Sequence, residues 1–88
     1  MDKAISAYRA TSEIDERNEL AMRELQQVYY VAARISERLP KHVEMQDLVQ
    51  AGVIGLLEAC KTYDPDRDAQ FSTFAKFRIR GAILDSLR

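Results

Sequence analysis

Apolar residues recur at helical spacing over most of the chain. From position 12 to Leu39 they return at alternating steps of four and three, which predicts a helix with one buried face. Pro40 ends this helix, because proline disfavours helical backbone at the residue before it. The apolar stripe is Ala21, Leu25, Val28, Ala32, Ile35 and Leu39, and the charged positions on the other faces are Arg17, Glu24, Arg34, Glu37 and Arg38.

A further helix is predicted from Glu44 to Thr62, after a loop at 41–43. Its acidic residues come first, where they favour the positive end of the helix dipole. Two glycines on one apolar face allow a neighbouring helix to approach closely, and a second apolar row must be buried or offered to a partner. The first face is Leu48, Gly52, Gly55, Leu56 and Ala59, and the second row is Val49, Val53, Leu57 and Cys60.

The last helix combines a core face with an unusual outer face. Pro and Asp residues predict a turn at 63–68, after which Ser72 or Thr73 caps a helix that runs to the chain end. At 100° per residue the side chains divide into two sets on roughly opposite sides. The core set is Phe71, Ala75, Ile79, Ala82 and Ile83, and the other, which mixes rings with arginines, is Phe74, Phe77, Arg80, Gly81, Leu84 and Arg88.

These elements predict an all-α fold. With a short helix at 2–10, followed by a cap at Thr11 and Ser12 that begins the next helix, they make a compact bundle of about four helices. The 88 residues suffice for a single domain spanning 1–88, and a hydrophobic content of 47% is that of a globular chain. The longest apolar run, 51–57, is far shorter than the roughly 18 residues of a membrane span. No secretory signal is visible and Cys60 is the only cysteine, so we expect a cytoplasmic protein without a membrane partner.

Charge is distributed unevenly along the chain. The formal net charge is −1, but residues 71–88 carry Lys76, Arg78, Arg80 and Arg88 against Asp85 alone. Local positive charge decides where a phosphate backbone docks, although a solvated helix face explains the same pattern.

The sequence contains no complete motif for metal binding or catalysis. Asp64, Asp66 and Asp68 have the spacing of a calcium loop, but Ala69 and Ala75 stand where that loop needs Gly and Glu. His42 and Cys60 are too few for a zinc site, and the glycine pair at 52 and 55 suits helix packing better than an RNA clamp. No nucleophile with its base is visible. We therefore expect neither enzyme activity nor a cofactor.

Three segments together resemble bacterial sigma factors of the sigma-70 family. Residues 47–59 (DLVQAGVIGLLEA) resemble the polymerase-binding segment, and residues 71–75 (FSTFA) the start of the promoter-melting segment. Residues 78–88 (RIRGAILDSLR) closely resemble the flagellar or motility branch. The match covers about 25–88. It implies the all-helical region 2 domain, which binds core RNA polymerase and opens the promoter minus-ten element.

The resemblance assigns the outer face of the last helix to DNA. It implies that Phe74, and with it Phe77, stacks on bases of the non-template strand, and Tyr63 would line the same cleft. Aromatic rings compensate the cost of unpairing, and nearby cations hold the backbone. Satellite core packing is the alternative for each ring. The expected polar contacts are Lys76 and Arg78 to phosphate and Arg80, Asp85 and Arg88 to bases, with Leu84 on the same face.

The resemblance also implies a contact between the 44–62 helix and the clamp coiled coil of the largest polymerase subunit. Asp47 and Gln50 match the family's contact positions, and a dipole role is the alternative for Asp47. Val49, Val53 and Leu57 are interface candidates, although such residues more often pack in a core. An anti-sigma factor is a further expected partner.

The chain departs from the family at several places. Phe74 replaces the usual Tyr, and Phe77 and Arg78 stand where housekeeping members have two Trp, which suggests weaker intrinsic melting. The chain also ends inside an expected helix, so we expect a fragment with domains downstream. The rival interpretation is a helical protein–protein interaction module without direct DNA binding.

Overall fold

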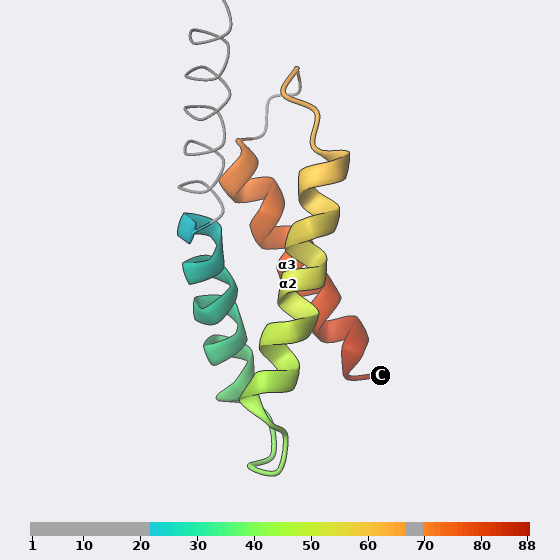
Figure 1. The fold of residues 1–88 in the computed structure, drawn as a ribbon. Helices are drawn as coiled ribbons and strands as arrows, with labels where there is room; N and C mark the ends of the chain where they lie inside the picture. The colour runs from blue at the N-terminus through green and yellow to red at the C-terminus, as the bar shows by residue number, and fades with distance from the viewer. Residues whose placement is uncertain (1–21, 67–69) are drawn as a thin grey trace, which may run out of the picture.

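The computed structural model describes residues 22–66 and 70–88. Within these ranges the chain forms three helices and no strand: residues 22–36, α2 (Met45–Thr62) and α3 (Phe71–Ser86), shown in Figure 1. The expected all-α class is confirmed for this part of the chain. The helix expected at 2–10 and the cap expected at Thr11 and Ser12 lie outside the described residues.

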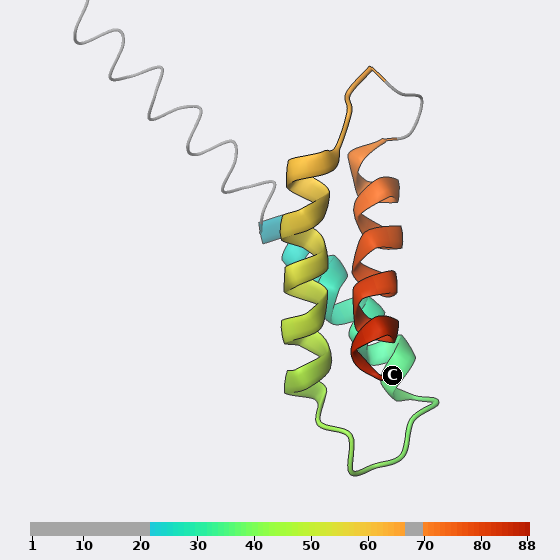
Figure 2. The ribbon, with the colours of Figure 1, turned by 90° about the vertical axis from the view of Figure 1, so that its right-hand side faces the viewer.

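The three helices pack around one core. α2 and α3 run antiparallel beside each other, and the 22–36 helix lies across the back of the pair (Figure 2). All three meet at Gly52, where an added β-carbon would lie 2.8 Å from Cγ1 of Val28 and 3.2 Å from Cδ1 of Ile83. Among the described residues, no helix is both long and apolar enough to cross a bilayer.

The helix ends follow the predicted stops with one exception. The first helix loosens into turns before Pro40, where the Leu39 N–H donates to the Ser36 carbonyl oxygen over 3.1 Å. α2 begins one residue after Glu44 and carries Asp47 in its first turn. The predicted start and end of the last helix are wrong. α3 begins at Phe71 after the extended residue Gln70, not after a Ser or Thr cap, and it ends at Ser86.

The predicted core faces are confirmed at their centres. Leu25, Ile35 and Leu39 of the first stripe are half-buried, and so are Phe71 and Ala82 of α3. The predicted face of α2 is buried over its whole length. One buried residue, Val31, lies beside the predicted stripe. The buried residues that the stripes predicted are Val28, Ala32, Leu48, Gly52, Gly55, Leu56, Ala59, Ala75, Ile79 and Ile83.

The second glycine of α2 brings two backbones into contact. A β-carbon at Gly55 would lie 2.7 Å from the carbonyl oxygen of Arg78 and 2.8 Å from the β-carbon of Ala82. Real side chains do not approach so closely, so only glycine fits here without moving α3. The predicted close approach of helices is confirmed at both glycines.

Replacing Gly55 by Ala is expected to lower the free energy of unfolding by about 1–3 kcal/mol, because the backbone it meets must shift. Gly81 is the matched control, since nothing lies within 4 Å of its β-carbon position. Gly81→Ala is expected to raise the same free energy by about 0.5–1 kcal/mol through helix propensity. Urea denaturation followed by circular dichroism measures both. Similar changes in the two variants would contradict the packing argument.

A buried carboxylate joins the 22–36 helix to the start of α3. Glu24 is only 3% exposed, although its charge suggested an outward position. Its Oε1 accepts a hydrogen bond from the Ser72 hydroxyl over 2.9 Å, while Oε2 is buried without a partner. Gln27 adds a second link, because its Nε2 donates to the Ser72 carbonyl oxygen over 3.0 Å. Ser72 therefore fastens two helices together instead of capping one.

Ser72→Ala is expected to lower the free energy of unfolding by about 1–3 kcal/mol, because the buried Glu24 carboxylate loses its hydrogen bond. Thr73→Ala serves as the control, since Thr73 is exposed and lies next along the same helix. Thermal denaturation of both variants measures the difference. If Ser72→Ala were as stable as Thr73→Ala, the hydrogen bond would contribute nothing to the fold.

Candidate functional site

The exposed ridge of α3 carries an aromatic ring with little cover. Phe77 is 70% exposed, the largest exposed fraction among the large hydrophobic residues described. At 100° per residue, Gly81, Leu84 and Arg88 follow Phe77 along the same side of the helix, and all three are exposed. The structure therefore brings together this part of the predicted DNA-binding face.

Phe74 lies apart from this ridge, in an aromatic cluster where α2 and α3 meet. The Tyr63 ring centroid is 5.7 Å from that of Phe74 and 5.1 Å from that of Phe71, the latter edge-to-face. All three residues are half-buried, so Phe74 supports the core and still reaches solvent. Tyr63 and Phe74 are neighbours, as expected from the sequence. The edge-to-face contact with Phe71 is a favourable aromatic geometry and holds the Tyr63 ring in place.

The cations of α3 divide between two sides of the helix. Nη2 of Arg78 lies 3.3 Å from Oε2 of Glu58 on α2, in an ion pair whose side chains are both about half exposed. Lys76 and Arg80 instead face the 22–36 helix. Asp85 is exposed near the helix end. The predicted polar contacts therefore do not form one patch, and only Arg78 is tied to a carboxylate of the described residues.

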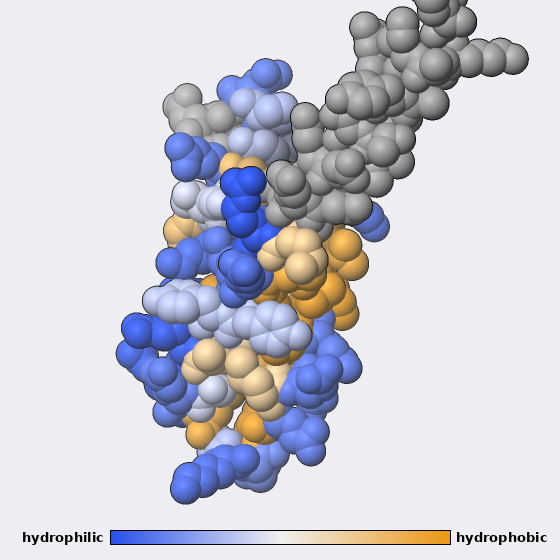
Figure 3. All heavy atoms as spheres, turned by 60° about the vertical axis from the view of Figure 1, so that its left-hand side comes forward, coloured by the Kyte–Doolittle hydropathy of each residue, from blue (hydrophilic) through white to orange (hydrophobic). Residues whose placement is uncertain are grey.

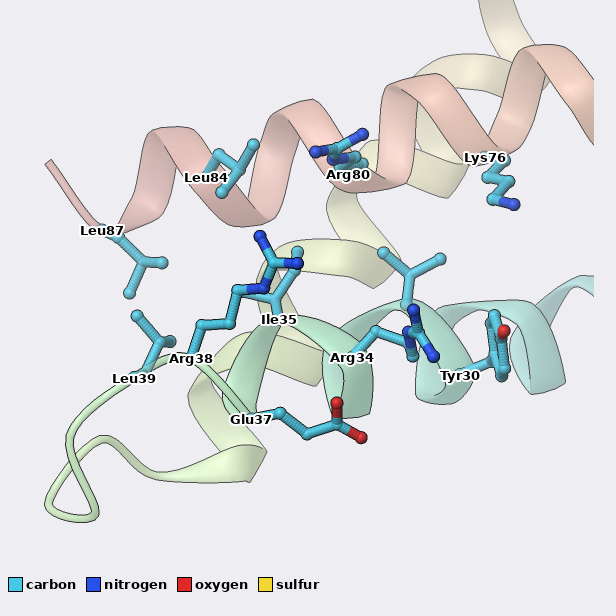
Figure 4. Close-up of a pocket in the computed structure, with 11 residues that line it drawn as sticks. Tyr30, Arg34, Ile35, Glu37, Arg38, Leu39, Lys76, Arg80, Leu84 and Leu87 are labelled. Atoms are coloured by element: carbon cyan, nitrogen blue, oxygen red, sulfur yellow. The ribbon is translucent and has the colours of Figure 1, made fainter.

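A groove of about 430 Å³ lies between the 22–36 helix and α3. Figure 4 shows Arg80 and Lys76 on its α3 side and Arg34, Arg38 and Tyr30 on the other. The last three were not predicted, although their spacing of four residues would place them on one face of the helix expected to run to Leu39. The full lining is Tyr30, Val31, Arg34, Ile35, Glu37, Arg38, Leu39, Lys76, Arg80, Leu84 and Leu87.

α2 exposes a different kind of surface. Asp47 and Gln50 are exposed, and Ile54 and Leu57, both 57% exposed, continue the same side of the helix. In Figure 3 hydrophobic atoms gather beside the 22–36 helix on the side where α2 lies, whereas the rest of that face is mainly hydrophilic. Ile54 was not predicted, because it lies beside the apolar row Val49, Val53 and Leu57 and not in it. We call Asp47, Gln50, Ile54 and Leu57 the α2 stripe.

Two of the predicted interface valines serve the core instead. Val49 is 5% exposed, and Val53 is half-buried against the core cluster. The two valines lie at a different angle about the α2 axis from the α2 stripe, so they face the packed helices. Val49 is therefore left out of the surface that we assign to a partner, and Val53 lies at its edge.

The turn between α2 and α3 is organised by its own side chains. The Asp66 N–H donates to Oδ1 of Asp64 over 2.9 Å, an Asx turn of the kind that Asp favours. In the described ranges, no group of three or more His, Cys, Asp or Glu residues lies close enough to hold a metal ion.

Three relatives show what this chain is similar to. It is 48% identical over 71 residues to RNA polymerase sigma-D factor of Bacillus subtilis. The aligned segment covers 81% of this chain and 28% of that protein. It is 44% identical over 88 residues to RNA polymerase sigma factor FliA of Pseudomonas aeruginosa, an alignment that covers 97% of this chain and 36% of the relative. FliA of Escherichia coli K12 is 46% identical over 83 residues, covering 94% and 34%. The chain spans about a third of the length of these curated relatives.

The family comparison covers most of the chain as well. The family described as Sigma-70 region 2 matches residues 20–88, which include all three helices and every predicted site residue. The resemblance found in segments 47–59, 71–75 and 78–88 is thereby confirmed. The chain belongs to the Sigma-70 region 2 family.

Proposed function

We propose that the chain is the domain of a transcription initiation factor that binds core RNA polymerase and recognises and melts the promoter minus-ten element. It would confer promoter specificity on a motility-type regulon, as the resemblance of residues 78–88 suggests. The observation that carries the proposal is the exposed Phe77 ring on α3 of a Sigma-70 region 2 chain, on a helix that also presents Lys76, Arg78, Arg80 and Arg88 at the surface. Its role is binding in the cytoplasm and not catalysis, and it needs no cofactor.

Opening a duplex without ATP requires a surface that captures bases once they leave the stack. Unstacking and unpairing cost a few kcal/mol, and an aromatic ring recovers about 1–3 kcal/mol for each base stacked on it. Phe77 offers an open face for this purpose. Phe74 offers a ring that Tyr63 holds in a defined orientation. Preorganised rings lose little conformational entropy on binding, which favours capture of the non-template strand.

The polar residues have distinct proposed roles. Lys76 and Arg78 contact phosphates, while Arg80, Asp85 and Arg88 read bases along the last turns of α3. Arg78 exchanges its ion pair with Glu58 for a phosphate, which is inexpensive because exposed pairs contribute about 0–1 kcal/mol. Leu84 supplies apolar contact between these polar positions.

The α2 stripe is the proposed contact with core RNA polymerase. A polar pair, Asp47 and Gln50, lies beside two exposed aliphatic side chains, Ile54 and Leu57. An apolar centre with a polar margin is typical of protein interfaces, and it suits the clamp coiled coil of the largest subunit. An anti-sigma factor that covered the same stripe would keep the domain away from polymerase.

Phe77→Ala is expected to weaken binding of a labelled single-stranded minus-ten oligonucleotide to the polymerase-bound protein by about 1–3 kcal/mol, or roughly 5- to 150-fold in Kd. The substitution removes an exposed ring, so thermal stability is expected to change little. Phe77→Leu is the matched control for apolar bulk and is expected to lose affinity too, whereas Phe77→Tyr keeps it. Full binding by Phe77→Leu would refute stacking, and no binding by the unsubstituted protein would favour the protein-interaction alternative.

Gln50→Ala is expected to weaken binding to core RNA polymerase roughly fivefold, or by about 1 kcal/mol, because one interfacial hydrogen bond is lost. Gln26→Ala makes the same chemical change on the outward side of the 22–36 helix and is expected to leave the affinity unchanged. Fluorescence anisotropy with labelled protein measures both Kd values. Equal affinities of the two variants would remove Gln50 from the interface.

A further inference from the structure

A buried carboxylate of the 22–36 helix lies at the start of α3. Glu24 is 3% exposed, and its Oε1 accepts the hydrogen bond of the Ser72 hydroxyl over 2.9 Å. Ser72 is the second residue of α3, so this hydrogen bond joins the first turns of two helices (Figure 1). Glu24 takes no part in the proposed contacts with DNA or polymerase, so its burial needs another explanation.

Glutamate is an unfavourable residue for this position. The second carboxylate oxygen of Glu24, Oε2, is buried without a hydrogen-bond partner. A buried oxygen that has lost water and gained no donor destabilises a folded chain, and an apolar side chain of similar volume is often neutral or stabilising in its place. Such exceptions to good packing are expected mainly at functional sites. The carboxylate therefore points to a role other than stability.

α3 begins without a side-chain cap of its own. Its N-cap residue, Gln70, makes no side-chain cap hydrogen bond, and no acidic residue lies in its first turn. The start of a helix carries free N–H groups and a partial positive charge, so a nearby carboxylate stabilises it. Glu24 supplies that carboxylate from another helix. Gln27 holds the same turn, because its Nε2 donates to the Ser72 carbonyl oxygen over 3.0 Å.

The turn held in this way carries the Phe74 ring. Phe74 follows Ser72 by two residues, and its N–H donates to the Gln70 carbonyl oxygen over 3.0 Å. The direction of a helical side chain follows from the position of its backbone, and helix ends fray first. Loss of the link at Ser72 would therefore move the Phe74 ring, whereas Phe77 lies about one turn further from the helix end.

We propose that Glu24 is a positioning residue for base stacking. Its buried carboxylate holds the first turn of α3 through Ser72, and this keeps the Phe74 ring in the orientation that receives a base. The inference rests on the proposed function, in which Phe74 stacks on the non-template strand. Because the turn is ordered before the strand arrives, binding does not have to order it. Glu24 itself touches no base and acts through Ser72 and Phe74.

The test compares two substitutions that break the same hydrogen bond with opposite effects on stability. Glu24→Met removes the buried charge and leaves the hydroxyl of the exposed Ser72 to water, so the melting temperature is expected to stay equal or rise. Ser72→Ala leaves the carboxylate buried without a donor, so the melting temperature is expected to fall. Both are expected to weaken binding of a labelled single-stranded minus-ten oligonucleotide to the polymerase-bound protein roughly fivefold in Kd, or by about 1 kcal/mol. Glu24→Gln keeps an oxygen acceptor for Ser72 and is expected to restore the affinity.

A double-mutant comparison separates positioning from a general effect on the fold. In a Phe74→Leu background, Glu24→Met is expected to have no further effect on Kd, because the ring that Glu24 positions is gone. In a Phe77→Leu background, Glu24→Met is expected to keep its full effect. Equal losses of affinity in the two backgrounds would make Glu24 a structural residue only and overturn the proposal.

Binding by the unsubstituted protein distinguishes this proposal from the proposed function. If the unsubstituted protein binds the strand and Glu24→Met binds it equally well, the positioning role is refuted while the proposed function stands. The same holds if Ser72→Ala alone loses affinity, since binding would then follow stability and not the shared hydrogen bond. If the unsubstituted protein binds no strand, the proposed function fails and the positioning role fails with it.

Discussion

At Gly55 the backbones of α2 and α3 come so close that one β-carbon would lie 2.7 Å from the carbonyl oxygen of Arg78. This contact holds α3 at one rotation about its own axis, with Ile79 and Ile83 fully buried. Because side chains leave a helix at fixed angles, the same rotation directs Phe77 to solvent and Arg80 to the groove. Every surface of α3 that we assign to DNA depends on that packing.

The proposed partners use separate surfaces of this small bundle. The α2 stripe is polar and aliphatic, whereas the ridge and groove of α3 are aromatic and cationic. An interface for protein benefits from burying Ile54 and Leu57, and one for a nucleic-acid strand benefits from positively charged guanidinium groups such as that of Arg80. Because no residue is shared between the two surfaces, the two proposed partners do not compete for the same side chains.

Much of this arrangement was predictable from residue spacing, since apolar periodicity located the helices and the core centres of α2 and α3. The failures came from contacts between distant segments. Glu24 occupies a core position because Ser72, 48 residues later, satisfies one of its oxygens. Neither that partner nor the lost cap at α3 can be read from local sequence. Arg34 and Arg38 were visible as a repeating pair, but only the folded chain brings them opposite Lys76.

The empty space around Gly81 has a consequence for the shape of α3. The next turn after Phe77 presents bare peptide groups, since no heavy atom lies within 4 Å of the position where a methyl group would begin. The surface beside the Phe77 ring is therefore open at Gly81, up to the exposed side chain of Leu84. Glycine is about 1 kcal/mol less favourable than alanine inside a helix. Gly81 therefore lowers the stability of this turn, and it leaves the surface next to Phe77 uncovered.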